Sequence, residues 1–138
     1  MNRDELIMLQ THPLNQRVFI VGNSSLFEEG ITSLLTLEIG LQVSSIKYTN
    51  DHALLDHIAQ HRPQVIILNE SSLVDPMYIL ELIFSSISLA GLCIIIMRLT
   101  DNMVDVYNMS QKTNARKLCK REQVILSKGD DLVAVVRG

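Results

Sequence analysis

The chain has 138 residues, a net charge of −3 and 47% hydrophobic residues, among which are three Phe and three Tyr but no Trp. This length fits a single domain, and its core must be aliphatic. The acidic balance argues against a bare nucleic-acid-binding surface, because contacts with phosphates need clustered basic side chains. The one basic stretch, residues 116–121, is interpreted as a solvated face.

The sequence has the features of a cytoplasmic protein. Cys93 lies in an apolar stretch and Cys119 in a charged one, so the two do not suggest a disulfide scaffold. The first residues lack the layout of a signal peptide, and the longest apolar stretch, residues 87–97, is too short to span a bilayer. We therefore expect a cytoplasmic chain that makes no membrane contact.

Residues 1–16 form a polar lead before the predicted domain, which covers residues 17–138. Within the lead, Leu6, Ile7 and Leu9 predict one turn of helix that Pro13 stops. The lead is either a frayed terminus or an arm that packs or dimerises, and both interpretations stay open.

Strands and helices alternate along the rest of the chain. Apolar strands are predicted at residues 17–21, 64–68 and 92–96, and a more polar edge strand at residues 42–48. Helices are predicted at residues 26–38, 51–61, 75–86 and 101–110. This alternation is typical of an α/β domain, here a doubly wound, five-stranded parallel sheet with helices on both faces.

The C-terminal part allows two assignments. In the preferred one, the fifth strand is residues 124–126 and a short helix covers residues 130–137. In the other, the strand lies at Leu118 and Cys119, and a longer helix starts at Val124. The second assignment puts Gly129 inside a helix, which costs about 1 kcal/mol.

Two segments resemble the receiver domain of response regulators, most closely that of LuxR-type transcription regulators. The family opens with an apolar strand, Asp-Asp-His-Pro and then Leu-Phe-Arg-Glu-Gly-Ile or similar; here residues 18–31 read VFIVGNSSLFEEGI. Residues 61–68, HRPQVIIL, resemble the approach to the family's phosphoacceptor. The resemblance covers residues 17–110 well and the remainder loosely, and it implies the flavodoxin-like receiver fold.

The resemblance also implies where the family's functional residues would stand. Its metal-binding acidic pair falls on Gly22 and Asn23, and its phosphoacceptor Asp falls on Asn69. Its hydroxyl residue falls on Met97, and its lysine on Lys128, or on Lys120 under the other C-terminal assignment.

These replacements predict a degenerate phosphoacceptor site. Gly22 and Asn23 offer Mg²⁺ no carboxylate. The amide of Asn69 is no nucleophile for an aspartyl phosphate, and the thioether of Met97 donates no hydrogen bond. We therefore expect no enzymatic activity, no metal and no cofactor.

The resulting hypothesis is a pseudo-receiver that works in signal transduction without phosphorylation, as the N-terminal dimerisation domain of a LuxR-type transcription regulator. Its partners would be proteins, including a second copy, with DNA bound only through an output domain outside this chain. Two of the predicted helices carry more apolar residues than one face of a sheet can cover, and such an excess indicates an interface. The candidate interface residues are Ile83, Phe84, Met103, Val106 and Tyr107. The alternative is a sensor domain for a nucleotide or cyclic dinucleotide.

Two further patterns in the sequence are weaker. His57 and His61 are four residues apart, a spacing that fits metal ligands but arises often on solvated helix faces, which is the interpretation that we prefer. Residues 22–25 follow a strand without a glycine-rich phosphate motif, although they could form a small polar pocket with Asn69.

Overall fold

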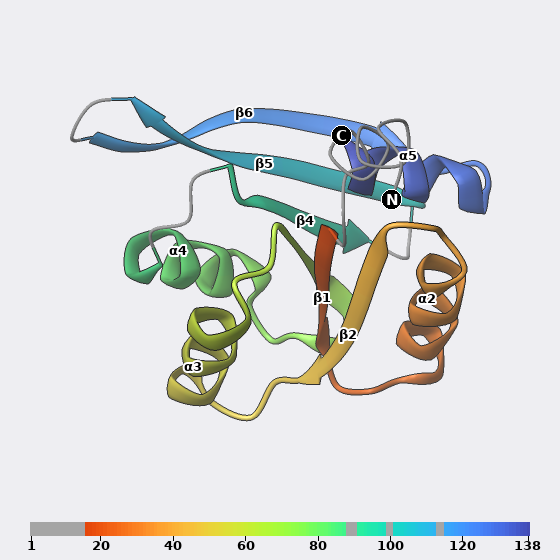
Figure 1. Cartoon of the computed structure of the whole chain (residues 1–138), viewed down its shortest axis with the longest axis horizontal. Coiled ribbons are helices and arrows are strands. Elements are labelled where there is room, and N and C mark those ends of the chain that lie inside the picture. Colours follow the sequence, from red (N-terminus) through yellow and green to blue (C-terminus); the bar gives the residue numbers. More distant parts are fainter. Residues whose placement is uncertain (1–15, 88–90, 99–100, 113–114) are drawn as a thin grey trace, which may run out of the picture.

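The computed structural model describes residues 16–87, 91–98, 101–112 and 115–138; within residues 109–112 and 115–122 it describes the backbone alone. The first half contains β1 (Gln16–Gly22), α2 (Leu26–Thr36), β2 (Leu41–Lys47), α3 (Asp51–His61), β3 (Val65–Asn69) and the short 3₁₀ helix η1 (Glu70–Ser72). The second half contains α4 (Pro76–Ser86), β4 (Cys93–Arg98), β5 (Met103–Lys112), β6 (Ala115–Ile125) and α5 (Gly129–Arg137). Figure 1 shows their arrangement.

The strands form one six-stranded sheet in the order β2-β1-β3-β4-β5-β6. The first four strands in this order are parallel, whereas β5 is antiparallel to β4 and β6 is antiparallel to β5. The α/β class is therefore confirmed. The prediction of a five-stranded, wholly parallel sheet is wrong, because the sheet is mixed and has a sixth strand.

The predicted helix at residues 101–110 is wrong, since this segment belongs to β5. Met103, Val106 and Tyr107 recur at helical spacing, but Val104 and Val106 also alternate with Asp105 and Tyr107. Valine and tyrosine favour strands, and the alternation places them on the two faces of a sheet. Asn102, with φ of 53°, takes the left-handed conformation just before β5, as asparagine does more readily than most residues.

Each of the two predicted positions of the fifth strand overlaps β6. That strand includes Leu118, Cys119 and Val124, but it pairs with β5 rather than with β4. The closing helix predicted at residues 130–137 is confirmed as α5. The longer helix starting at Val124 is wrong: Gly129 is the first helical residue, and Lys128 is the N-cap.

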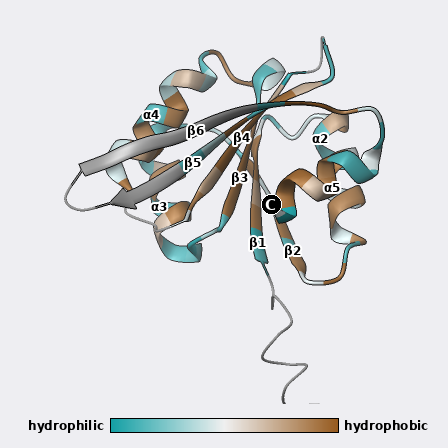
Figure 2. Cartoon of the chain, turned by 90° about the horizontal axis from the view of Figure 1, so that it is seen from above, coloured by the Kyte–Doolittle hydropathy of each residue, from teal (hydrophilic) through white to brown (hydrophobic). Residues whose placement is uncertain are grey.

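Helices cover both faces of the sheet, as Figures 1 and 2 show. On one face α3 and α4 pack against alternate strand residues such as Phe19, Ile66 and Ile94. On the other face α2 and α5 pack against the intervening residues, such as Ile20, Ile67 and Ile95. Because β3 is buried on both faces, its continuous apolar run is the pattern expected of a central parallel strand.

Within the described residues, no helix combines the length and the apolar character needed to cross a bilayer. Of the predicted lead at residues 1–16, only Gln16 is described, and it is the first residue of β1. The helical turn predicted around Leu6 lies outside the described residues.

Candidate functional site

The carboxyl ends of β1 and β3 meet at one edge of the sheet, which is where a parallel sheet places its site. Gly22 ends β1 and Asn69 ends β3, and Asn69 stands opposite Met97 on the neighbouring β4. The structure thus brings together the positions that the sequence analysis selected on these three strands.

The side chain at the centre of this edge is Glu28 of α2, which the sequence analysis did not select. It is buried, with 1% of its surface exposed. Its carboxylate accepts hydrogen bonds from the Asn69 amide at 2.8 Å and from the hydroxyls of Ser72 at 2.5 Å and Ser25 at 3.0 Å. Two backbone N–H groups also donate to it, from Asn23 at 3.4 Å and Ser24 at 3.0 Å. We call these six residues the Glu28 cluster.

The local sequence explains how Glu28 reaches this position. Ser25 is the N-cap of α2 and its hydroxyl accepts from the Glu28 N–H, so the two residues form a Ser-x-x-Glu pair at the start of the helix. Ser24 adopts a left-handed conformation, with φ of 62°, within the loop whose N–H groups donate to the carboxylate. Gly22 leaves space for the carboxylate, because a Cβ there would lie 2.2 Å from a Glu28 oxygen.

Both polar atoms of the Asn69 side chain form hydrogen bonds within or next to this cluster. Its Nδ2 donates to Glu28 and to the Ser72 hydroxyl, and its Oδ1 accepts from the N–H and the hydroxyl of Ser71. Its side chain is also the N-cap of η1. Asn69 therefore acts as a structural link between β3, α2 and η1.

The electrostatics of the cluster follow from these contacts. Burial raises the pKa of the Glu28 carboxyl, but the hydrogen bonds from Ser72, Asn69, Ser25 and Asn23 together outweigh burial, so the pKa lies below its ordinary value of 4.5. The carboxylate is consequently ionised at neutral pH. A fixed negative charge therefore occupies the end of β1 and β3, where it repels any incoming anion.

The other two predicted site residues do not join the cluster. The side chain of Met97 is 5% exposed and packs in the core between the sheet and the helices α2 and α5. Lys128 is exposed at the start of α5. It lines a groove of about 310 Å³ whose other lining residues include Phe27, Leu34 and Leu126.

Two signals in the sequence could have selected Glu28. The first is the Ser-x-x-Glu pattern of residues 25–28 before an apolar run, which is typical of a capped helix. The second is that Glu28 stands where the receiver pattern quoted above has Arg. A carboxylate at that position lies at the ends of β1 and β3.

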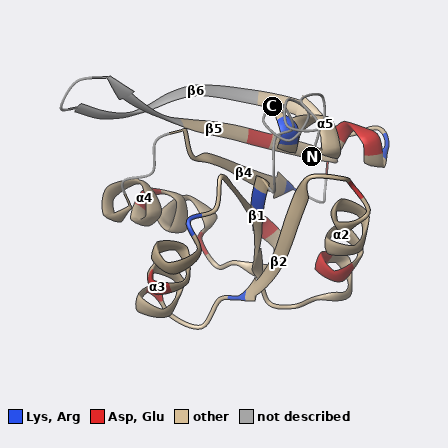
Figure 3. Ribbon diagram, viewed as in Figure 1, with Lys and Arg blue, Asp and Glu red and all other residues tan. Residues whose placement is uncertain are grey.

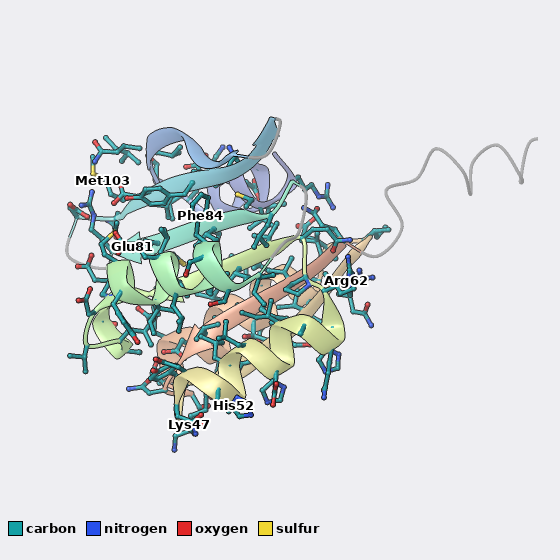
Figure 4. The ribbon with its side chains drawn as sticks, turned by 90° about the vertical axis from the view of Figure 1, so that its left-hand side faces the viewer. Lys47, His52, Arg62, Glu81, Phe84 and Met103 are labelled. Carbon is teal, nitrogen blue, oxygen red and sulfur yellow. The ribbon has the colours of Figure 1, made fainter. Side chains whose placement is uncertain are left out.

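The candidate interface residues divide into two groups. Ile83, Val106 and Tyr107 are buried in the core, so their side chains cannot form an exposed surface. Phe84 and Met103 are half-buried and lie on the same side of the molecule, where α4 passes near β5 (Figure 4).

A second polar cluster lies close to the first. The Asp51 carboxylate accepts hydrogen bonds from the Tyr48 and Tyr78 hydroxyls, the latter at 2.5 Å. The hydrogen bond to Asp51, burial and the charge of Asp51 raise the pKa of Tyr48 to about 12. The same two hydrogen bonds lower the pKa of Asp51. This contact joins the N-terminus of α3 to α4.

Lys, Arg, Asp and Glu residues stand on several of the coloured helices and strands rather than on a single element (Figure 3). The His57 and His61 rings stack with their centroids 6.3 Å apart. In the part of the chain that the structure describes, no three His, Cys, Asp or Glu side chains are placed to hold a metal ion.

No protein-family model and no curated protein sequence matches the chain. Among solved structures, the backbone is similar to a crystal structure of a HypX variant from Aquifex aeolicus, with 10% sequence identity and a TM-score of 0.47. The alignment covers 89% of this chain and 26% of the HypX chain, so this chain spans about a quarter of that protein's length. A similarity of this size carries no argument about function.

Proposed function

We propose that this chain is a receiver-like regulatory module that works without phosphorylation and associates with itself, as the N-terminal dimerisation domain of a LuxR-type transcription regulator would. The observation that carries the proposal is the Glu28 carboxylate at the strand ends. It sits among donors supplied by its own chain, at the place where a phosphorylated receiver needs room for a metal ion and a phosphoryl group. A module closed in this way must transmit its signal through contacts rather than through chemistry.

The start of α4 supports self-association. This helix buries Ile79, Leu80 and Ile83 against the sheet. In its first turn Met77 is 42% exposed and Tyr78 is 50% exposed. Val74, just before the helix, is fully exposed. Exposed apolar groups that gather in this way mark interfaces, and two-fold dimers are the commonest result. We call Val74, Met77 and Tyr78 the α4 patch.

The test is the oligomeric state, measured by light scattering coupled to gel filtration over a dilution series at micromolar concentrations. We expect a dimer with or without acetyl phosphate and Mg²⁺. Met77→Lys should give a monomer, because it places a charge in the α4 patch. The matched control Leu37→Lys, at an 82% exposed apolar residue after α2, should leave the dimer intact. A monomer at every concentration, or a dimer that forms only with the phosphoryl donor, contradicts the proposal.

The alternative, a sensor for a nucleotide or cyclic dinucleotide, has less support. Such ligands are anionic, and the buried Glu28 carboxylate repels anions at the strand ends. Thermal-shift measurements against nucleotides distinguish the two functions, since only a sensor gains stability from a ligand that binds its folded state.

A further inference from the structure

Two exposed histidines of α3, His57 and His61, lie one helical turn apart on the same side of the helix. Their rings are nearly parallel, with an angle of 17° between the ring planes. In the described part of the chain, neither imidazole takes part in a hydrogen bond or an ion pair. His52, at the start of the same helix, is instead paired with Asp56 at 3.4 Å. The ring nitrogens of His57 and His61 are therefore available to a ligand.

The two rings are close to the arrangement of a chelating pair. A Zn²⁺ ion that binds one nitrogen of each ring at about 2.1 Å, in tetrahedral geometry, holds the ring centroids about 5 Å apart. The observed centroids are 6.3 Å apart, so one side chain has to move by only about 1 Å. His61 is the fixed member of the pair, because its ring packs edge-on against buried Phe19 with the centroids 5.8 Å apart. The exposed His57 is free to rotate toward it.

The charges around the pair select the class of ion. His61 lies in the last turn of α3, where the partial negative charge of a helix end favours a cation. The guanidinium of Arg17 lies at the same helix end, where it donates to the Arg62 carbonyl at 3.0 Å. Because Arg17 and Arg62 are both positive, the affinity has to come from the imidazole nitrogens. Imidazole suits Zn²⁺, Ni²⁺ and Cu²⁺, whereas Mg²⁺ and Ca²⁺ prefer oxygen ligands.

We propose that His57 and His61 bind one divalent transition-metal ion, such as Zn²⁺, with water completing its coordination. The sequence alone favours a solvated helix face; the parallel rings and the contact of His61 with Phe19 carry the proposal. The site lies on α3 just before β3 begins, so it is separate from the Glu28 cluster at the end of β3. Such an ion joins two residues across one helical turn and stabilises the folded chain.

The test is a calorimetric titration of the full chain with Zn²⁺, with Mg²⁺ as the control ion. We expect His57→Gln and His61→Gln each to weaken Zn²⁺ binding at least about tenfold, because each leaves the ion with one imidazole ligand. His52→Gln should leave the affinity unchanged. Cys93 and Cys119 are present in all these chains, so metal bound to their thiols does not distinguish them.

A matched control keeps the number of histidines and changes only their spacing. Ala59 is exposed, and His57→Gln/Ala59→His places the two histidines two residues apart, on different sides of the helix. This variant should bind Zn²⁺ as weakly as His57→Gln. Zn²⁺ should also raise the melting temperature of the original chain and of His52→Gln, but not that of the spacing variant.

Equal affinity in the original chain and in the spacing variant overturns the proposal, because the two imidazoles would then bind independently. A loss of binding in His52→Gln as large as that in His57→Gln also overturns it. Paramagnetic Cu²⁺ locates the ion: it should broaden the nuclear magnetic resonance signals of residues 57–61 first, and broadening centred on another segment contradicts the proposal. Circular dichroism of each variant verifies that the fold is retained.

Discussion

The Glu28 cluster predicts an unusual effect of adding one methyl group to Gly22. A Cβ at this position would lie 2.2 Å from one carboxylate oxygen and 2.3 Å from the carboxyl carbon of Glu28. Gly22→Ala must therefore expel the carboxylate from its donors. Hydrogen bonds to a charged group are worth about 1.5–3 kcal/mol each, but the expelled carboxylate regains water, so we expect a net loss of about 3 kcal/mol in the free energy of unfolding.

Gly22→Ala should have the opposite effect on the free energy of unfolding when Glu28 is absent. Glu28→Ala alone should also cost about 3 kcal/mol, because Asn69 and Ser72 lose the same partner. The backbone of Gly22 is extended at the end of β1 and is not among the glycines with positive φ. Alanine is favoured over glycine in a strand by about 0.5–1 kcal/mol, so Gly22→Ala should slightly stabilise the Glu28→Ala chain.

Urea unfolding of the four proteins in this double-mutant cycle measures the coupling, which we expect to be about 3.5–4 kcal/mol. The Gly22→Ala single variant should also melt about 10 °C lower than the original chain. If Gly22→Ala costs the same with and without Glu28, the methyl group acts on the backbone and the reasoning from the carboxylate is refuted.

Four further predictions follow from the same contacts. Because hydrogen bonds hold the pKa of Glu28 below 4.5, its contribution to stability is complete above that pH and is lost as the pH falls through the lower folded-state value; Glu28→Gln should flatten this part of the stability–pH curve. Mass spectrometry after treatment with acetyl phosphate and Mg²⁺ should find no adduct that depends on Asn69. Asn69→Asp should not restore beryllofluoride-dependent dimerisation, and it should lower the melting temperature at neutral pH, because it puts a second carboxylate about 2.8 Å from the first. Asp51→Asn should bring the pKa of Tyr48 from about 12 back toward 10, as measured by ultraviolet absorbance titration.

The parallel part of the fold could be predicted because two signals agreed along its length. Continuous apolar runs such as residues 64–68 predict strands buried on both faces, and capped amphipathic segments predict helices. The segment from Met103 to Tyr107 satisfied both periods at once, and an Asp that could cap a helix preceded it. The segment becomes a strand because it forms a hairpin with β4, and the pattern within the segment alone does not show this pairing.

In the candidate site, too, the sequence predicted part of the arrangement: the positions at the strand ends, but not the direction of the Glu28 side chain. The sequence correctly placed Gly22 and Asn69 at adjacent strand ends, because sheet topology alone brings those positions together. It did not place Glu28 there, because a glutamate in the first turn of a helix is ordinarily exposed and helps to cap its own helix. The direction of its side chain depends on the space at Gly22 and on donors from three separate segments.

The error in the predicted sheet has a consequence for the proposed dimer. A right-handed crossover after β4 would place its helix beside α4, on the same face of the sheet. Because β5 follows β4 as a hairpin instead, within the described residues only α3 and α4 cover that face. Met103 lies there opposite Ile125, which is 64% exposed, and opposite residues of an antiparallel pair share a face. The α4 patch therefore borders sheet surface that a parallel fold would have buried, and a second copy of the chain can cover both.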